Sequence, residues 1–185
     1  MKKLFVIIAV LFYSAAHAQS AEVSAAKPTL NEINIEAIIN QKYPSCKILS
    51  PTDLNEGLQS YLIKSLGHQT PGIVPTDLTG DGIKDYAVLL RCKNKKAPNR
   101  VTEKFAILVG KGNNKYDWNF IAKWEDKLSL DNLYLTLIEP STLKDVNDGK
   151  EVQLTNAGVE LNLFEAAARV YYFENGKIKF VQVSD

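Results

Sequence analysis

The feature that most constrains the fold is the stretch from Asp77 to Leu90, in which a loop rich in oxygen donors runs into an apolar segment. The five residues from Tyr86 to Leu90 are all apolar. Neighbouring side chains of a strand point to opposite faces of a sheet, so a strand that is apolar throughout is expected to be covered on both faces. The sequence therefore predicts a buried central strand that begins at a polar loop.

The loop carries side chains that suit calcium. Asp77, Asp81 and Asp85 recur every four residues, and the hydroxyl of Thr79 lies between the first two. Calcium prefers hard oxygen ligands, and a curled loop supplies them from alternate residues together with a backbone carbonyl. The pattern predicts a structural calcium ion with five ligands: Asp77, Thr79, Asp81, Asp85 and the carbonyl of Ile83. The alternative is a polar turn without metal, because Gly and Asp are favoured in turns.

The loop is not an EF-hand, because Val88 stands where an EF-hand needs a bidentate glutamate and a strand-like run follows. Over the nine residues from Asp77 to Asp85 it resembles the D-x-[DN]-x-D-G-x-x-D calcium loop of FG-GAP and integrin-propeller repeats, with Thr79 as a weaker third ligand. A propeller needs several such repeats. The chain has one copy, and as a whole it resembles small exported bacterial proteins of unknown function that carry one such loop before a Tyr-Ala-Val-Leu-Leu strand.

The N-terminus has the three parts of a secretory signal peptide. Lys2 and Lys3 precede an apolar run over residues 4–12, and Ala16-His17-Ala18 offers a small-x-small cleavage site. The apolar run is shorter than the roughly 20 residues that cross a bilayer. We therefore predict a bacterial protein, periplasmic or secreted, without a membrane anchor once the signal peptide is removed.

The chain is expected to fall into three segments. Residues 1–18 are predicted to be the signal peptide, cleaved after Ala18. Residues 19–30 are rich in Ala and Ser and are interpreted as a flexible leader. Residues 31–185 are long enough to form one domain with its own core.

The charge balance argues against a nucleic-acid partner. The chain has 22 Lys and Arg against 21 Asp and Glu, which gives a formal net charge of +1, and the two signs are interspersed. A nucleic-acid surface needs a basic patch, and a membrane-surface site needs a polybasic segment. Neither is visible in the sequence, so we expect no nucleic-acid partner.

The chain has only two cysteines, Cys46 and Cys92. In an oxidising compartment an even pair favours a disulfide, which here would close a loop of about 47 residues and contribute about 4 kcal/mol in the chain-entropy account. The alternatives are two buried free thiols or a redox pair, although the spacing is not Cys-x-x-Cys.

His68 is the only histidine that remains after cleavage. A catalytic interpretation would make it a general base, because histidine titrates near neutral pH. The simpler interpretation is an ordinary loop histidine, since no motif supplies a nucleophile or a carboxylate beside it. We expect no catalytic residue in this chain.

The periodicity of the chain predicts two helices followed by strands. Helices are expected over residues 31–41, with Asn31 as N-cap, and over residues 53–66, ended by Gly67. Strands are expected at 86–92, 105–109, 116–124, 134–138 and 158–164 and in the C-terminal hairpin. This order predicts an α+β fold, with N-terminal helices packed on one face of a mainly antiparallel, hairpin-connected sheet of about six or seven strands.

Two of these strands carry finer predictions. Alternation in the strand over residues 116–124 should place one set of side chains on a single core-facing side: Tyr116, Trp118, Phe120, Ala122 and Trp124. In the C-terminal hairpin, Asn175-Gly176 is a type I′ turn pair, which requires positive φ at both residues. Counting outwards from this turn pairs Glu174 with Lys177, Phe173 with Ile178, Tyr171 with Phe180 and Val170 with Val181.

The first function hypothesis is a non-enzymatic exported protein with a structural calcium loop that binds another macromolecule or a cell-envelope component. One alternative is a secreted calcium-dependent hydrolase, although the Gly-x-Ser-x-Gly and His-Glu-x-x-His signatures are missing. The other is a structural module with no metal. The partner and the substrate do not follow from the sequence.

Overall fold

The structure is a computed structural model that describes residues 34–65, 70–93, 101–125 and 131–185. The predicted signal peptide, residues 1–18, and the predicted leader, residues 19–30, lie outside the described residues, as do Asn31, His68 and Gly67. No helix in the described part of the chain is long and apolar enough to cross a membrane.

The strand predicted to be central lies within a five-stranded antiparallel sheet. Its strands are β1 (Cys46–Ile48), β2 (Ile73–Thr76), β3 (Asp85–Lys93), β4 (Val101–Gly110) and β5 (Tyr116–Glu125). The order is β1-β3-β4-β5, and β2 pairs with the same edge of β3 as β1 does, nearer the start of β3. β3 is therefore paired on both sides, as the sequence predicted.

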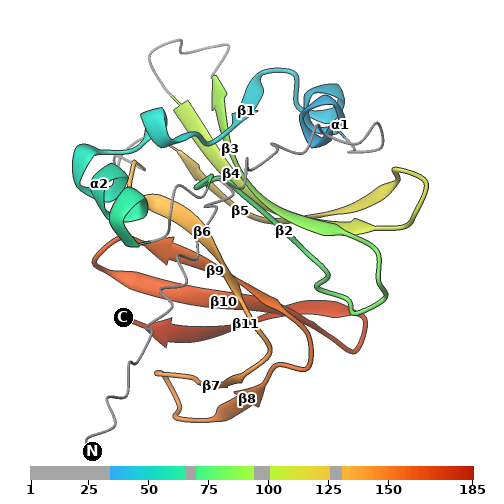
Figure 1. Cartoon of the computed structure of the whole chain (residues 1–185), viewed down its shortest axis with the longest axis vertical. Coiled ribbons are helices and arrows are strands. Elements are labelled where there is room, and N and C mark those ends of the chain that lie inside the picture. Colours follow the sequence, from blue (N-terminus) through green and yellow to red (C-terminus); the bar gives the residue numbers. More distant parts are fainter. Residues whose placement is uncertain (1–33, 66–69, 94–100, 126–130) are drawn as a thin grey trace, which may run out of the picture. The chain divides into compact units, whose positions relative to one another are not determined.

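The C-terminal half of the chain forms two further antiparallel sheets, drawn in orange and red in Figure 1. The four-stranded sheet has the order β11-β10-β9-β6 and consists of β6 (Leu133–Ile138), β9 (Gly158–Leu163), β10 (Ala167–Glu174) and β11 (Lys177–Ser184). A two-stranded sheet, β7 (Thr142–Lys144) with β8 (Glu151–Gln153), interrupts the connection from β6 to β9.

The helices are short and each begins at a capping side chain. α1 (Ile35–Lys42) starts after Asn34, whose side chain accepts a hydrogen bond from the amide of Ala37. A 3-10 turn, η1 (Pro51–Asp53), precedes α2 (Glu56–Ser65). The Asn55 side chain accepts from the amide of Leu58 at 2.9 Å and caps α2. A cap of this kind satisfies an amide that has no partner within the helix.

Alternate residues of β3 face two different cores. Ala87 and Leu89 join the larger core, which also contains Val159 and Tyr171 of the four-stranded sheet and so packs the two large sheets together. The other face of β3 contributes a second core that includes Tyr86, Val88 and Leu90. All five residues from Tyr86 to Leu90 are buried, which confirms that this strand is covered on both faces.

The predicted α+β class is confirmed at this coarse level, but its details were wrong. The described residues hold eleven strands in three sheets, not six or seven in one. The helices do not form one N-terminal block, because β1 lies between them. They also do not share a face of the sheet: Ile39 of α1 belongs to the core on one side of β3, and Leu58 and Leu62 of α2 belong to the core on the other side.

The aromatic strand β5 does not keep its alternation. Phe105 of β4 pairs with Ala122, but its neighbour Ala106 pairs with Phe120, so Ile121 is an extra residue in β5. A bulge of this kind reverses which residues face the core. Trp118 therefore packs on the core that contains Tyr86, whereas Trp124 packs on the core between the sheets. The prediction of a single aromatic face was wrong, and Phe120 is 50% exposed.

The C-terminal hairpin confirms the predicted turn and register. Asn175 and Gly176 both have positive φ, at 52° and 76°. The pairs observed between β10 and β11 include the predicted ones: Glu174 with Lys177, Phe173 with Ile178, Tyr171 with Phe180 and Val170 with Val181.

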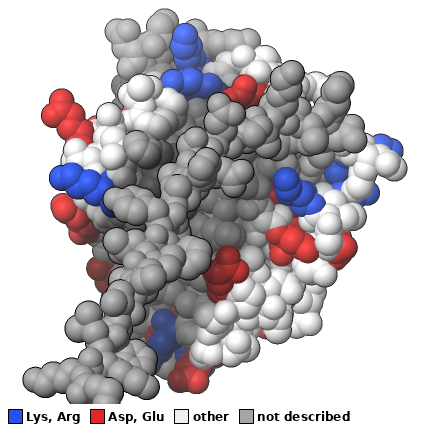
Figure 2. Space-filling model, viewed as in Figure 1, with Lys and Arg blue, Asp and Glu red and all other residues white. Residues whose placement is uncertain are grey.

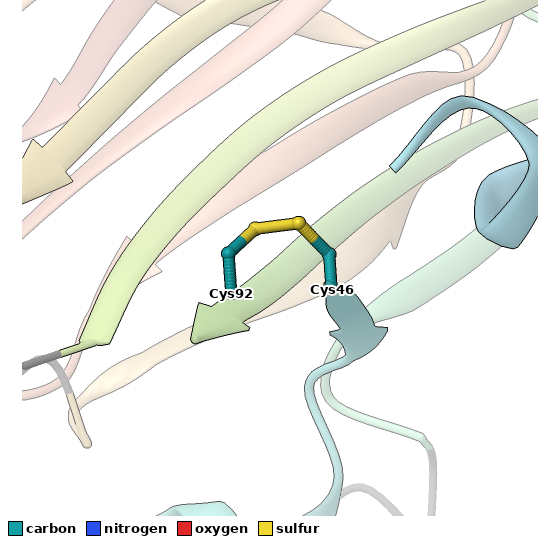
Figure 3. Close-up of a disulfide and its surroundings, with 2 residues drawn as sticks. All are labelled: Cys46 and Cys92. Carbon is teal, nitrogen blue, oxygen red and sulfur yellow. A yellow bond between two sulfur atoms is a disulfide. The ribbon is translucent and has the colours of Figure 1, made fainter. Parts of the chain in front are cut away.

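The predicted disulfide between Cys46 and Cys92 is present. The two residues lie directly opposite each other in the ladder of β1 and β3, with their Cα atoms 3.9 Å apart (Figure 3). Both are buried, and the bond ties the segment after α1 to the end of the central strand. A structural disulfide is consistent with an oxidising, exported location.

Candidate functional sites

The predicted calcium loop connects β2 to β3. The backbone curls through Gly80 and Gly82, which have φ values of +75° and +79°. A side chain is strained in this left-handed region, whereas glycine is not. The loop therefore has the tight turn that its glycines indicated, and it ends at Asp85, the first residue of β3.

Asp85 is completely buried and is surrounded by backbone amides. Its Oδ2 accepts hydrogen bonds from the amides of Leu78 at 2.8 Å and Thr79 at 3.1 Å, and its Oδ1 accepts from the amide of Gly110 at 2.7 Å. Burial raises the pKa of the Asp85 carboxyl above its ordinary value, and the three amides oppose that rise. The carboxylate therefore joins the loop to the end of β4.

Asp77 holds the outer part of the loop in a similar way. Its Oδ1 accepts from the amides of Gly80 at 2.7 Å and Asp81 at 3.1 Å, and its Oδ2 accepts from the amide of Gly82 at 2.8 Å. The Thr79 hydroxyl is 3.4 Å from Oδ1 of Asp77. Asp81 is exposed and accepts a hydrogen bond from the amide of Ile83 at 2.8 Å.

These contacts fit a calcium cage only in part. Among the described residues, no three His, Cys, Asp or Glu side chains gather as metal ligands. Asp85 does not fit the predicted role, because it is enclosed and both of its oxygens face amides of the protein. Asp77 and Asp81 lie on the outer part of the loop with Thr79 and Ile83. Six amide hydrogen bonds, three to Asp77 and three to Asp85, offset the negative charge of these two carboxylates.

The loop is fixed against both halves of the protein. A Cβ at Gly110 would lie 2.6 Å from Cγ2 of Ile83 and 2.7 Å from the carbonyl oxygen of Lys84, so only glycine permits this approach. On the other side, Gly80 lies against Asn156 in the connection between β8 and β9, where an added Cβ would be 2.6 Å from the Asn156 amide. The loop therefore has a structural role whether or not it holds an ion.

A second group of charged residues, which the sequence did not reveal, lies beside the core between the sheets. Arg91 of β3 and Glu103 of β4 are cross-strand neighbours, and Nε of Arg91 donates to Oε1 of Glu103 at 2.8 Å. Arg91 also donates to the carbonyl oxygen of Asp53 at 2.9 Å. Nζ of Lys47 lies 2.7 Å from Oδ1 of Asp53. The group links β3, β4 and η1.

The two carboxyl groups of this cluster shift in opposite directions. Burial raises the pKa of Glu103, which is 1% exposed, although Arg91 opposes the rise. Within the described residues its Oε2 has no hydrogen-bond partner. Burial also tends to raise the pKa of Asp53, but hydrogen bonds from Lys47 and Ser50 outweigh it and lower the pKa to about 2. The shifts differ because Lys47 and Ser50 both donate to Asp53, whereas the more deeply buried Glu103 has Arg91 as its one donor residue among the described residues.

A cavity of about 220 Å³ lies next to this cluster, between β5 and the four-stranded sheet. Trp124, the cross-strand neighbour of Glu103, forms part of its wall. The other lining residues come from β6, β9, β10 and β11: Leu133, Leu161, Leu163, Ala167, Ala168, Arg169 and Gln182. The wall is therefore almost entirely apolar, and its polar members are Arg169 and Gln182.

Arg169 is held in place beside the cavity by its neighbours. Its Nε donates to Oε1 of Gln182 at 2.6 Å, and its guanidinium lies over the ring of Phe180, 5.2 Å from the ring centre. Among the described residues, no carboxylate lies within ion-pair distance of Arg169. The cavity thus combines an apolar wall with a positive charge that no described residue neutralises.

Charged side chains on the visible surface are mixed in sign. Where Figure 2 shows described residues, Lys and Arg are interspersed with Asp and Glu, and these residues form no extended patch of either sign. This agrees with the interspersed charges of the sequence. An electrostatic footprint for nucleic acid would be a continuous basic stripe.

Comparison with known proteins gives no relative for this chain: no protein-family model, no curated protein and no solved structure matches it. The function must therefore be argued from the sites themselves.

Sequence reasoning missed both the cavity and the cluster around Arg91. The cavity wall comes from five strands that are distant in the sequence, and its residue types are those of any core. Arg91 gave one available signal, because it interrupts the apolar run of β3 and Glu103 is an acid in the next strand. A buried charged residue inside a strand needs a partner, so the pair was open to prediction.

Proposed function

We propose that this chain is an exported binding protein that holds a component of the cell envelope in the cavity between β5 and the four-stranded sheet. The observation that carries the proposal is the cavity itself, about 220 Å³ with an almost wholly apolar wall. Ligand sites are typically concave and apolar, with a few polar groups that orient the ligand. Arg169 and Gln182 are the polar groups here.

The physical basis of binding would be the hydrophobic effect. Trp124, Leu161 and Leu163 form wall surface that loses its contact with water when an apolar group enters. The wall consists mostly of strand residues, whose backbones are fixed by ladder hydrogen bonds. A site of this kind needs little ordering when the ligand binds, so little of the binding free energy is lost to entropy.

Two observations support the export part of the proposal. The sequence of residues 1–18 has the charged, apolar and cleavage regions of a signal peptide. The disulfide between Cys46 and Cys92 suits an oxidising compartment, because such bonds persist there and are rare in a reducing cytosol. An envelope component is the ligand class that such a protein would meet.

The test is to purify the full chain after export from a bacterial host and to measure its mass under native conditions. The proposal predicts an added small-molecule mass that is lost after extraction with organic solvent. Ala167→Phe, which places a ring in the cavity, should abolish the added mass. Ala166→Phe, at the exposed neighbouring position, is the matched control and should retain it. An unliganded mass in both the native protein and the control variant would count against the proposal.

We also propose that the β2–β3 loop binds calcium as a structural ion. The spacing of Asp77, Thr79, Asp81 and the Ile83 carbonyl supports this proposal, as does the exposed position of Asp81. Asp85 would remain bonded to the amides of Leu78, Thr79 and Gly110 rather than join the ion. Calcium would stabilise the loop but take no part in the ligand site. The test is the effect of calcium on thermal stability.

A further inference from the structure

We propose that the ligand of the cavity is an amphiphile with one short or medium-length acyl or alkyl chain and an anionic head, bound with its chain against Trp124 and its head at Arg169. This inference rests on the proposed function, because it names the class of ligand that the same cavity would take. It follows from the size of the cavity, from the chemistry of its wall and from the charge beside it.

The volume of the cavity limits the apolar part of the ligand. An engineered apolar cavity of about 150 Å³ in another protein stays dry and binds benzene. The cavity here, at about 220 Å³, is somewhat larger and is bounded by four large apolar side chains: Trp124, Leu133, Leu161 and Leu163. It therefore suits a single chain or a ring.

The charge at Arg169 determines the head of the ligand. Nε of Arg169 is bonded to the neutral side chain of Gln182. Tyr171 is a second partner, and burial raises the pKa of its hydroxyl, so it carries no charge at neutral pH. A guanidinium has five N–H donors, so several remain for a ligand. Arg169 is exposed as well as part of the cavity wall, which places its charge where the cavity meets solvent.

Other classes of ligand fit this site less well. A cationic amphiphile would bring two positive charges together beside an apolar wall. A neutral chain would cover the cavity but would gain nothing from the Arg169 guanidinium, whose remaining N–H donors would stay in solvent. A carboxylate or a phosphate can accept two parallel N–H bonds from a guanidinium, and this geometry makes arginine a favoured anion receptor. The two heads share this chemistry, and the experiment must separate them.

The chain provides its own reporter, because one of its two tryptophans lines the cavity and the other does not. Trp124 is part of the wall, whereas Trp118 packs against Tyr43 in the core on the other side of the five-stranded sheet. The variant Trp118→Phe leaves Trp124 as the only tryptophan. The reciprocal variant Trp124→Phe is the matched control. Bromine quenches tryptophan fluorescence on contact, so 8-bromooctanoate locates the chain of a bound ligand.

The closing experiment titrates oxidised protein with four probes that have different heads on alkyl chains of seven or eight carbons: octanoate, octyl phosphate, octanol and octyltrimethylammonium. We expect 8-bromooctanoate to quench Trp124 in Trp118→Phe and to leave Trp118 unquenched in Trp124→Phe. The anionic probes should compete with it at least about tenfold more strongly than octanol, the factor expected for one charge-assisted hydrogen bond. The stronger of octanoate and octyl phosphate identifies a free carboxylic acid or a phosphate head as the natural source.

A charge variant provides the second arm. Arg169→Gln should lower the affinity for octanoate about tenfold or more and leave the affinity for octanol unchanged. Lys177→Gln, which removes a lysine from the turn end of β11 and not from the cavity wall, is the matched control and should bind octanoate as the native protein does. Calorimetric titration of the unsubstituted protein gives the same comparison if either tryptophan variant is poorly folded.

The outcomes separate the two proposals. Equal affinities for octanol and octanoate, or equal affinities of the native protein and Arg169→Gln for octanoate, would overturn the proposal of an anionic head. The cavity would then remain a site for an envelope component with a different head. Failure of all four probes, together with calorimetric binding of a peptide that ends in a leucine carboxylate, would replace the amphiphile with a peptide. If no probe binds, the proposal of an amphiphilic ligand is rejected. The proposed function is rejected as well only if the exported native protein carries no added small-molecule mass.

Discussion

The amide of Gly110, at the end of β4, donates a hydrogen bond of 2.7 Å to Oδ1 of Asp85, at the start of β3. The absence of a side chain at Gly110 lets the loop before Asp85 approach this closely, since a Cβ there would lie 2.6 Å from Ile83. A buried carboxylate thus fixes the end of one strand to the beginning of its neighbour. The loop is part of the core architecture, although its sequence resembles that of a calcium loop.

Asp85→Ala should be among the most destabilising single substitutions in this chain. It removes the acceptor for three backbone amides, and each buried amide left without a partner costs about 1–3 kcal/mol. We expect a loss of at least about 3 kcal/mol in the free energy of unfolding. Urea denaturation of the oxidised protein measures it.

The matched control for this prediction is Asp81→Ala in the absence of calcium. Asp81 is exposed and accepts one hydrogen bond from the loop, so its removal should cost about 1 kcal/mol or less. If Asp85→Ala and Asp81→Ala lower the free energy of unfolding equally, the burial of Asp85 has no energetic consequence.

Features fixed by local chemistry were the ones that the sequence could predict. Asn175 and Gly176 both adopt positive φ, and this turn determines the register of β10 against β11 as far as Arg169, where the register shifts. Cys46 and Cys92 were predictable because they were the only possible pair. The continuous apolar run of β3 indicated a central strand without knowledge of its neighbours.

Features that depend on distant strands were not predictable in the same way. No glycine marks the bulge at Ile121, yet the bulge moves Trp124 to the face opposite that of Trp118. Arg169 and Trp124 lie in different sheets, and only the packing of those sheets creates the cavity between them. Period-two patterns specify the two sides of a strand, but they do not specify what covers each side.

The calcium loop illustrates a different limit. The spacing of Asp77, Asp81 and Asp85 predicted a cation between them. In the structure, backbone amides surround Asp77 and Asp85 and offset their charge. Backbone donors are invisible in a residue pattern, because every residue except proline carries one. The ligand spacing alone therefore does not distinguish a loop that is closed by an ion from one that is closed by amides.

The Asp53 carboxyl should make the protein sensitive to acid below pH 4. Its pKa is lowered from 3.8 to about 2 by hydrogen bonds from Lys47 and Ser50, which outweigh the effect of burial. A group whose pKa is lower in the folded state stabilises the protein above its unfolded pKa, and that stability is lost as the pH falls through the folded pKa. The contribution, on the order of 2 kcal/mol, should therefore disappear between about pH 4 and pH 2.

The measurement is the free energy of unfolding of the native protein and of Asp53→Asn as a function of pH. The difference between them should be largest at neutral pH and should shrink as the pH falls from about 4 to about 2. Lys47→Met removes the strongest pKa-lowering contact of Asp53, so in this variant the pKa of Asp53 should lie closer to 3.8 and the pH-dependent difference in stability should be smaller. If the difference in unfolding free energy between the native protein and Asp53→Asn is constant over this pH range, Asp53 does not contribute to the acid sensitivity.

Reduction of the disulfide should destabilise the protein by up to about 4 kcal/mol, the chain-entropy value for a loop of this length. Cys46 and Cys92 pair β1 with β3 over a sequence separation of 46 residues, so the bond restricts the unfolded chain over a long loop. Denaturation of the oxidised and reduced forms, with the double variant Cys46→Ser and Cys92→Ser as the reference for the reduced form, measures the difference. The prediction fails if all three unfold at the same denaturant concentration.

Calcium should raise the melting temperature of the oxidised protein, because an ion bound to the folded loop stabilises the folded state alone. At 100 times its dissociation constant such a ligand contributes about 2.7 kcal/mol. The measurement compares melts in EGTA and in millimolar calcium, and the rise should be lost in Asp81→Ala, whose side chain is the exposed member of the predicted ligand set. Magnesium in place of calcium is the control for charge alone, because its strict octahedral geometry suits a flexible oxygen loop poorly. Superimposable melts would mean that the six amides bound to Asp77 and Asp85 are sufficient to close the loop.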